Sequence, residues 1–253
     1  MTSISGNLAA EQRLDRMRDV LEKDGALRLA DVAVDLGVSE MTVRRDLQQL
    51  ESLGIARRVR GGAVALTPTS FADRHKAHAR AKSRIAAKLV GLVPETGAIG
   101  VDASSTVMRM TRVLEPRRGL TVITNGLESF TALSAVAGIR PVLTGGELDS
   151  RTGSLVGPLA ARAAGQLMLR RLFVSSAGVD PRLGTGETCL EEAEVKQALA
   201  RVSEDVVVAV DSSKLGSRGT ALGLSWEQVR VLVTDLDPAH PRLAEYRERV
   251  ELL

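Results

Sequence analysis

The chain has few of the residues that build disulfide scaffolds, metal centres or membrane spans. Its 253 residues include one cysteine, one tryptophan, one tyrosine and three phenylalanines. A single cysteine can form neither an intrachain disulfide nor a multi-thiolate metal site, which fits a reducing compartment. No apolar run approaches the ~20 residues needed to cross a bilayer, and the first residues lack the order of a signal peptide. We therefore expect a cytoplasmic protein with no cofactor, no metal site and no membrane association.

Length and composition predict two globular domains. Hydrophobic residues make up 44% of the chain and charged residues 26%, which is an ordinary globular balance. This length suits a small domain joined to a larger one with its own core. The turn-rich segment 67–70 (Thr-Pro-Thr-Ser) marks the break. We place a first domain over 1–66, a linker over 67–80 and a second domain over 81–253.

Positive charge is concentrated in one part of the chain, although the net charge is only +3. Between residues 41 and 88 there are eleven lysines and arginines and only three acidic residues. The distribution of charge, more than its sum, governs binding to a polyanion. Charge alone is compatible with a solvated face as well as with a nucleic-acid site, so the order of the structural elements must decide.

Helical spacing in the first 53 residues predicts a helix-turn-helix. Apolar residues recur at helical spacing over 9–23, 30–36 and 40–53, with Gly37 ending the second helix and Ser39 capping the third. On the third helix an apolar stripe that ends at Leu53 faces inward, while Arg44, Arg45 and Gln48 face outward. Arginine and glutamine side chains can bind guanine and adenine edges bidentately in the major groove. An ordinary charged surface helix is the alternative interpretation.

A β-hairpin is predicted directly after these helices. Polar and apolar residues alternate over 55–59, a turn follows at 60–62, and a second short run covers 63–66. A hairpin behind three helices forms a winged helix, whose arginines would lie along phosphates or enter the minor groove. The predicted DNA-contacting residues are Ser39, Met41, Thr42, Arg44, Arg45, Gln48, Arg57, Arg58 and Arg60.

The second half of the chain alternates between short β-rich runs and helical patterns. The predicted strands cover 98–102, 120–125, 140–145, 171–175, 205–211 and 230–235, and the predicted helices cover 81–92, 106–115, 127–137, 158–168 and 190–203. Apolar strands separated by helices indicate an α/β domain with a mostly parallel sheet covered on both faces. In such sheets ligands bind beyond the carboxyl ends of the strands.

Polar residues and glycines follow almost every predicted strand. The first strand runs into Asp102-Ala103-Ser104-Ser105-Thr106 and then a helix, so hydroxyls and backbone amides there suit an anion such as a phosphate. An ordinary helix cap is the alternative, and Lys214 could neutralise a phosphate or a carboxylate. His75 and His78 have no further ligand type nearby, and we assign them no metal. The predicted effector-binding residues are Asp102, Ser104, Ser105, Thr106, Asn125, Gly146 and Lys214.

Both halves of the sequence resemble the DeoR family of bacterial transcriptional regulators. Residues 38–47 (VSEMTVRRDL) and 57–63 (RRVRGGA) match the family patterns V-S-x-x-T-[IV]-R-R-D-L and R-x-H-G-G-A, with Arg60 in place of the common histidine. The second half resembles the family's sensor domain at 144–146, 151–158, 191–196 and 211–214.

The resemblance implies a winged helix-turn-helix joined to a ribose-5-phosphate-isomerase-like α/β sensor domain. Its implied partners are operator DNA, a sugar phosphate or related metabolite, and further copies of the chain as a dimer or larger even oligomer. The implied function is repression of a sugar or polyol catabolic operon, relieved by a phosphorylated effector. Ala177 stands where the family often has an acid, and Ser104 where it often has glycine, so the effector's identity stays open.

Two other functions compete with this prediction. The first is a sugar-phosphate isomerase-like enzyme with an accessory DNA-binding domain. Its chemistry needs a carboxylate base, and Ala177 occupies the position where one is expected, so we predict no enzyme and no catalytic residue. The second is a nucleoid-type DNA binder without a ligand, against which the polar strand ends argue.

Overall fold

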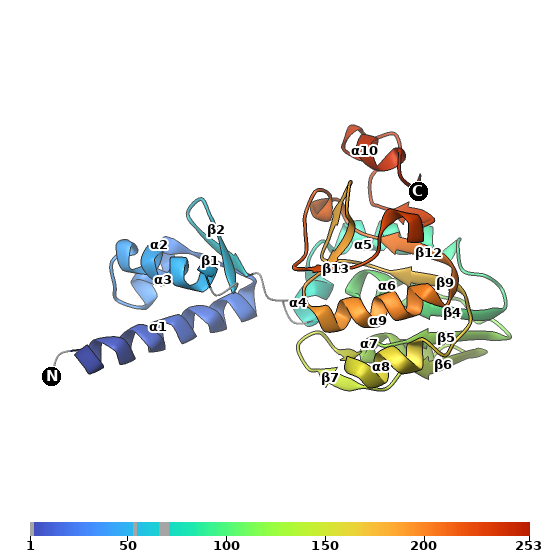
Figure 1. The fold of residues 1–253 in the computed structure, drawn as a ribbon, viewed down its shortest axis with the longest axis horizontal. Coiled ribbons are helices and arrows are strands. Elements are labelled where there is room, and N and C mark those ends of the chain that lie inside the picture. Colours follow the sequence, from blue (N-terminus) through green and yellow to red (C-terminus); the bar gives the residue numbers. More distant parts are fainter. Residues whose placement is uncertain (1–2, 53–54, 66–70) are drawn as a thin grey trace. The chain divides into compact units, whose positions relative to one another are not determined.

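The computed structural model describes residues 3–52, 55–65 and 71–253 and divides into two compact units, residues 1–74 and 75–253 (Figure 1). Residues 71–80, predicted as linker, contain helix α4 (Phe71–Lys76) and the start of α5 (Ala79–Val90). The predicted helix end at Leu53 and Gly54 and the predicted break around Pro68 lie outside the described residues.

The smaller unit has the predicted order of helices and strands. Its helices are α1 (Ser3–Asp24), α2 (Leu29–Asp35) and α3 (Glu40–Ser52), and its strands are β1 (Ala26–Arg28), β2 (Ala56–Val59) and β3 (Gly62–Ala65). Helix α1 begins earlier than the predicted Ala9. The short segment before α2 forms β1, which makes the hairpin part of an antiparallel sheet in the order β1-β3-β2.

A close backbone approach joins the hairpin to the helices. Leu27 of β1 pairs with Ala63 of β3, and a Cβ added at Gly62 would lie 2.0 Å from the carbonyl oxygen of Leu27. Only glycine therefore fits at position 62. Met17, Leu21, Val43, Leu47 and Leu50 are buried in the core between α1 and α3, so the predicted inward face of α3 is confirmed for its described residues.

The larger unit is an α/β domain built on a parallel sheet of seven strands in the order β15-β14-β12-β9-β4-β5-β6. These strands are β4 (Gly97–Val101), β5 (Leu120–Thr124), β6 (Ile139–Leu143), β9 (Leu169–Val174), β12 (Ser203–Ala209), β14 (Val231–Val233) and β15 (Glu251–Leu252). The predicted strands all occur, within a few residues of their predicted bounds. The α/β prediction is confirmed.

Helices cover both faces of this sheet. Along β12, Val206 and Val208 pack into one core, and Val207 and Ala209 pack into the other, as alternating side chains of a strand require. The core of Val206 and Val208 also contains side chains of α8 (Gly157–Ala164), α9 (Leu190–Arg201) and α10 (Ala244–Arg247). The core of Val207 and Ala209 contains side chains of α5, α6 (Ser105–Arg112) and α7 (Leu127–Ser134). Within the described residues, no helix combines the length and apolar character that crossing a membrane requires.

Shorter elements, which sequence periodicity did not predict, lie around the sheet. They are the hairpin β7 (Glu147–Asp149) and β8 (Ser154–Val156), and a small sheet of β10 (Gly178–Asp180), β11 (Gly184–Glu187) and β13 (Ala221–Leu222). Three 3₁₀ turns cover Ser212–Lys214, Trp226–Gln228 and Pro241–Leu243. Strands this short contain too few residues to show a two-residue period.

The order of the strands reverses between β4 and β9. From β4 the chain proceeds through β5 to β6 at one edge, and it then returns to β9 on the other side of β4. In doubly wound sheets ligands bind at such a reversal, beyond the carboxyl ends of the two strands. We call the carboxyl ends of β4 and β9, with the loops that follow them, the crevice. The loops after β4 and β9, residues 102–104 and 175–177, meet at this point.

Candidate DNA-binding surface and effector site

Helix α3 presents its predicted outer face to solvent. Arg44, Arg45 and Gln48 are exposed, and Met41 is 75% exposed. Ser39 caps the helix, because its Oγ accepts a hydrogen bond from the Thr42 amide at 3.2 Å and lies 2.9 Å from Thr42 Oγ1. The predicted cap is confirmed, and two arginines and a glutamine are free of the core on one helix face.

Asp46, on the inner side of the same helix, ties α3 to α1. Its carboxylate is 5% exposed and accepts two hydrogen bonds from Arg13, from Nε at 2.8 Å and from Nη2 at 3.3 Å. Such a bidentate pair restrains both position and rotation of a helix. Asp46 therefore sets the direction in which Arg45 and its neighbours point.

The wing hairpin uses one of its arginines to hold itself against α3. Glu51 accepts hydrogen bonds from the backbone amide of Arg58 at 3.0 Å and from its guanidinium at 2.5 Å. These bonds to Arg58 lower the pKa of Glu51. Arg57 and Arg60 are exposed, and among the described residues neither has an ion-pair partner.

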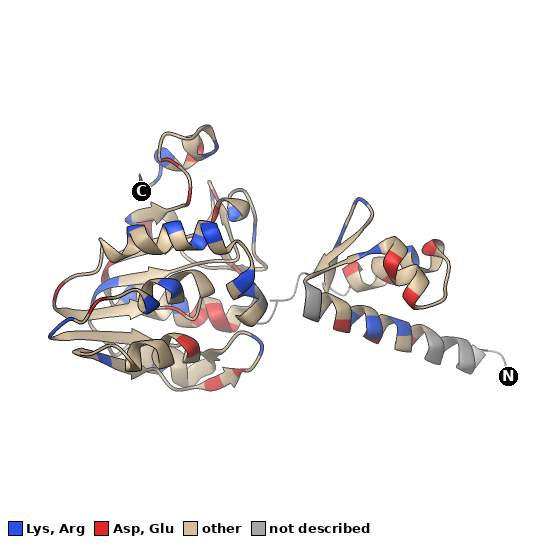
Figure 2. Cartoon of the chain, turned by 180° about the vertical axis from the view of Figure 1, so that it is seen from behind, with Lys and Arg blue, Asp and Glu red and all other residues tan. Residues whose placement is uncertain are grey.

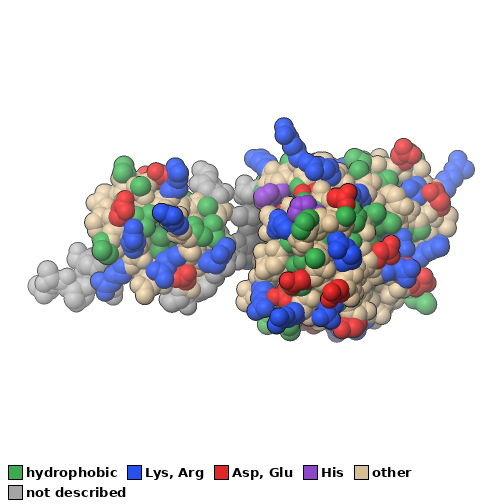
Figure 3. Space-filling model, turned by 90° about the horizontal axis from the view of Figure 1, so that it is seen from above, with side chains coloured by type: hydrophobic (Ala, Val, Ile, Leu, Met, Phe, Trp, Pro, Cys, Tyr) green, Lys and Arg blue, Asp and Glu red, His purple; other side chains and the backbone are tan. Residues whose placement is uncertain are grey.

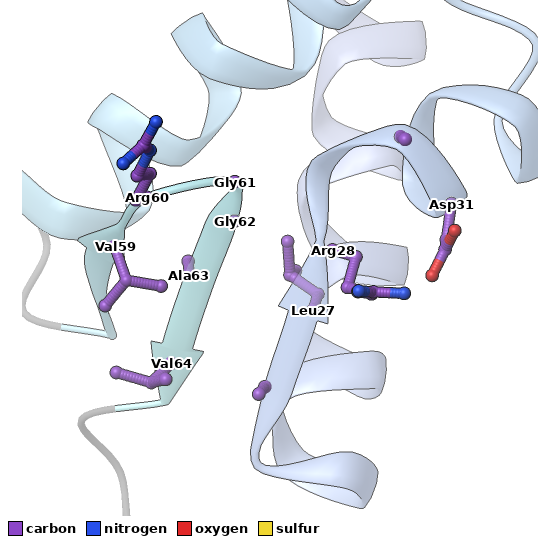
Figure 4. A pocket seen from close by; sticks show the side chains of 11 residues that line it. Leu27, Arg28, Asp31, Val59, Arg60, Gly61, Gly62, Ala63 and Val64 are labelled. Carbon is purple, nitrogen blue, oxygen red and sulfur yellow. The ribbon is translucent and has the colours of Figure 1, made fainter.

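A groove of about 580 Å³ lies between β1 with the start of α2 on one side and the wing on the other (Figure 4). Leu27, Val59 and Val64 are among the residues that line it, and Arg28 and Arg60 lie on opposite sides. Arg28 is exposed and was not among the predicted DNA-contacting residues. It adds a cation beside the wing.

At the crevice of the larger unit, Asp102 connects the two strand-end loops. Its carboxylate, 3% exposed, accepts hydrogen bonds from the Ser175 amide at 2.9 Å and the Ser104 amide at 3.1 Å. Ser104 Oγ in turn accepts the Val107 amide at 3.2 Å and so caps α6. Asp102 thus shapes the entrance to helix α6.

Lys196 of α9 balances the buried negative charge beside Asp102. Its Nζ lies 2.8 Å from Glu187, 3.4 Å from Asp102 and 2.7 Å from the Ser175 carbonyl oxygen. Burial raises the pKa of Glu187 to about 7 although Lys196 opposes this. Burial disfavours the charged form of Lys196, but Glu187 and Asp102 outweigh it and raise the pKa of Lys196.

Two further lysines lie at the same edge of the sheet. Lys82 of α5 is 4% exposed, and its Nζ donates to Ser105 Oγ at 3.1 Å. Lys214 donates to the Ser176 carbonyl oxygen at 2.5 Å and to Ser175 Oγ at 3.5 Å. The pKa of Asp211 is lowered, although burial alone would raise it. The lowering comes from the hydrogen bond donated by Ser213 and from the nearby positive charges of Lys214, His78 and Lys82.

The remaining predicted effector residues lie farther along the edge. Thr106 is buried in the first turn of α6. Asn125, after β5, is bonded to Leu155 of β8 through its side-chain amide at 3.2 Å. Glu192 lies beyond it and accepts Ser154 Oγ at 3.1 Å. Gly146 follows β6, two strands from β4, where an added Cβ would lie 2.6 Å from the Val156 carbonyl oxygen. The structure thus groups Asp102, Ser104, Ser105 and Lys214 and leaves Gly146 apart from them.

Several charged residues of these sites were absent from the prediction, and for three of them the sequence contains a signal. Asp46, Lys82 and Lys196 lie at helical spacing among apolar residues of α3, α5 and α9, on the faces that pack inward. A charged side chain on an inward face must find a partner. Only the fold shows which partner it finds.

A winged helix with an exposed basic face, in one chain with a doubly wound α/β domain, defines the class of two-domain DNA-binding regulators. The chain matches the DeoR-like helix-turn-helix domain over residues 13–69 and the DeoR C terminal sensor domain over residues 77–236. The chain belongs to the DeoR family. It is a DNA-binding transcriptional regulator and not an enzyme.

Relatives of similar length support this assignment. The chain is 32% identical over 247 residues to the lactose phosphotransferase system repressor of Streptococcus mutans, covering 94% of this chain and 98% of that one. It is 31% identical over 228 residues to the HTH-type transcriptional regulator GolR of Listeria innocua, covering 88% and 90%. Among solved structures it is similar to ribose 5 phosphate isomerase A from Neisseria gonorrhoeae, with 20% identity, 53% and 52% coverage and a TM-score of 0.37. A likeness this partial carries no argument about function.

Three carboxylates lie at this edge of the sheet, although Ala177 stands where an acid was expected. They belong to Asp102, Glu187 and Glu192. Asp102 and Glu187 are buried and paired with Lys196, so these two acids serve the packing of the loops. The family, rather than Ala177, decides that the chain is a regulator.

Proposed function

We propose that this chain represses a sugar or polyol catabolic operon in the cytoplasm, and that a phosphorylated sugar or polyol releases it from its operator. The observation that carries the proposal is the convergence of Lys82, Lys214 and the Ser104-Ser105 turn at the reversal point between β4 and β9. Cations, hydroxyls and the start of a helix together suit a phosphate. The Streptococcus mutans relative is named as a lactose phosphotransferase system repressor, which supports this ligand class.

The other end of the effector would lie toward β5. Asn125 and Glu192, with Ser154 between them, offer hydrogen-bond acceptors and donors of the kind that bind sugar hydroxyls. A ligand that binds here can change DNA affinity only if it favours one arrangement of the protein over another.

On the DNA side, Arg44, Arg45 and Gln48 would read base edges while Arg57 and Arg60 contact phosphates. Arg58 also lies on the wing, but its guanidinium already donates a hydrogen bond to Glu51. Fewer of its donors are therefore available to a phosphate. Because one winged helix covers only half of a palindromic site, we propose a homodimer or a larger even oligomer.

Replacing Arg44 or Arg45 by alanine will weaken binding to the operator by ~1–3 kcal/mol and affect random DNA less, because base contacts carry sequence specificity and phosphate contacts do not. Binding is measured by fluorescence anisotropy on operator and random duplexes at one salt concentration.

Arg57→Ala provides the matched control, since it should weaken both duplexes equally. Sedimentation of the same complexes gives the number of protein chains bound to each operator duplex. Equal losses of Arg44→Ala on both duplexes would refute base reading, and a monomer that protects a full palindrome would refute the oligomer.

Replacing Lys82 by methionine or Lys214 by alanine will weaken effector binding at least tenfold, because a charge-assisted hydrogen bond contributes about 1.5–3 kcal/mol. The probes are a panel of sugar and polyol phosphates, with their unphosphorylated forms and inorganic phosphate for comparison. Thermal shift and release of operator DNA are measured on the same samples. A coupling free energy of ~1–3 kcal/mol between effector binding and DNA binding is enough for a switch.

Lys88→Met is the matched control from the same helix, because Lys88 donates to the carbonyl oxygens of Thr234 and Leu236 and not to the crevice. It should leave the response intact. The site is misplaced if all three variants respond like the wild type, and the ligand class is wrong if no phosphorylated compound stabilises the protein or releases DNA.

A further inference from the structure

The basic run of the sequence extends past the winged helix into the larger unit, and the fold divides it. Lys82 points inward to Ser105, and Lys88 donates to backbone carbonyl oxygens at 2.9 and 3.1 Å. These two lysines therefore donate their hydrogen bonds to groups within the larger unit. Lys76, Arg80 and Arg84 remain exposed on α4 and α5, and neither the fold nor the winged helix accounts for them.

Helix α6 adds two arginines to the same surface. The Arg109 guanidinium donates to the His75 carbonyl oxygen at 2.6 Å and to Ser83 Oγ at 3.5 Å, which places it between α6 and the α4–α5 segment. Arg112, one turn further along α6, is exposed. We call these residues the α5–α6 basic face, which consists of Lys76, Arg80, Arg84, Arg109 and Arg112.

Among the described residues, no carboxylate forms an ion pair with this face. Elsewhere in the same unit Arg117, Arg171 and Arg218 pair with acidic side chains at 2.6 to 2.8 Å. Burial and the charges of neighbouring basic residues lower the pKa of the adjoining His75, and the negative charge of Glu128 on α7 only partly opposes this. Seen from behind, the helices on this side of the larger unit carry several basic segments (Figure 2).

The like charges of the face oppose one another. Arg80 and Arg84 are one helical turn apart, as are Arg109 and Arg112, and like charges at this spacing destabilise a helix. Burial lowers the pKa of Arg109, and Arg112 lowers it further. A bound polyanion would relieve this repulsion. In the space-filling view basic side chains stand on the surface of both units (Figure 3).

We infer that the α5–α6 basic face binds phosphate groups of duplex DNA, in addition to those contacted by the winged helix. Lys76, on α4, follows Ala65, the last residue of the wing strand β3, by eleven positions. Once the winged helix is on DNA, a face attached by so short a connection meets phosphates at a high effective concentration. Each phosphate that it contacts releases counterions. This inference rests on DNA binding by the winged helix.

The test compares two double variants of the full chain. Arg80→Gln/Arg84→Gln removes two cations of the face, and Arg162→Gln/Arg201→Gln removes two exposed arginines from α8 and α9 on the opposite side of the sheet. Binding to a random-sequence duplex of about 50 base pairs is measured by fluorescence anisotropy from about 50 to 200 mM KCl. A random duplex isolates phosphate contacts from base reading.

We expect the first variant to reduce the slope of log affinity against log salt by about 2, since each lost phosphate contact removes about 0.9. Its affinity at the lowest salt should fall about tenfold, and the control should match the wild type. Lys76→Gln/Arg112→Gln repeats the test on the other exposed members of the face, and circular dichroism verifies folding.

Unchanged slopes in both variants of the face would overturn the inference. A changed sedimentation coefficient with an unchanged slope would also overturn it and would assign the face to contacts between copies of the chain. A wild-type protein that binds no duplex would instead contradict the DNA-binding function itself, so the two failures are distinguishable.

Discussion

Replacing Lys196 by methionine will lower the free energy of unfolding of the larger unit by about 3–5 kcal/mol, which is the usual effect of removing one partner of a buried ion pair. The substitution leaves Glu187 and Asp102, which are 2% and 3% exposed, without the ammonium group that lies 2.8 and 3.4 Å from them. It also removes the donor to the Ser175 carbonyl oxygen. Urea denaturation followed by circular dichroism measures the loss.

The loss should depend on pH in a defined direction. Burial raises the pKa of Glu187 to about 7 from an ordinary 4.5, so the folded wild type retains a proton that the unfolded chain releases. This contribution to stability is complete below pH 4.5 and is lost as the pH rises through about 7. Without Lys196 the carboxylate is still harder to ionise in the fold, so the variant's deficit should grow as the pH passes 7.

Glu187→Gln is the control for this explanation. It should flatten the pH dependence of stability near pH 7, and adding Lys196→Met to it should cost less than Lys196→Met alone, because one buried carboxylate is already absent. A Lys196→Met protein as stable as the wild type on both sides of pH 7 would show that the carboxylates do not depend on this lysine.

Replacing Asp46 by alanine will destabilise the smaller unit by about 2–3 kcal/mol, because it removes the partly buried bidentate pair with the Arg13 guanidinium. The effect stays below that of Lys196 because the Arg13 side chain is 20% exposed and keeps some hydration. Operator affinity should fall as well, since α3 loses its anchor to α1. Hydrogen exchange of the α3 amides and anisotropy on operator DNA measure the two consequences.

Glu51→Ala is the matched control, because Glu51 is a carboxylate of the same helix that also pairs with an arginine. Its pair with Arg58 is exposed, with 33% and 47% of the two side chains accessible, and exposed pairs contribute at most about 1 kcal/mol. If Asp46→Ala and Glu51→Ala were equally mild, burial of the Arg13 pair would not be what anchors α3.

Periodicity and turn residues in the sequence were enough to predict most of the fold. Apolar residues at helical spacing defined α2, α3 and α5, and continuous apolar runs defined β4, β5, β9 and β12, because a buried face imposes its own repeat on the residues that cover it. The exposed faces followed from the same repeat, so Arg44, Arg45 and Gln48 could be assigned to the solvent-facing side of α3. The β7–β8 hairpin and the β10-β11-β13 sheet could not be predicted, because their strands are short and most contain glycine or charged residues instead of an apolar run.

The candidate effector site could also be predicted only in part from the sequence. Sequence order alone assigned Asp102, Ser104, Ser105 and Lys214 to strand ends, because the carboxyl ends of parallel strands lie on one edge of a sheet. It could not show that β4 and β9 are neighbours, since their paired residues, such as Ile99 and Arg171, are 72 positions apart and meet only through the sheet order. Gly146 shows the limit, because it follows a strand as predicted but packs against Val156 and Ala160.

What the sequence by itself determined is therefore the repeat of each element, the cap at Ser39, and the side of each helix that faces water. What only the tertiary structure decided is the partner of each charged residue on an inward face: Arg13 for Asp46, Ser105 for Lys82, and Glu187 with Asp102 for Lys196. The physical reason is that a helical repeat is a local property of the chain. A buried charge is instead satisfied by whichever group the folding of distant segments brings within about 3 Å.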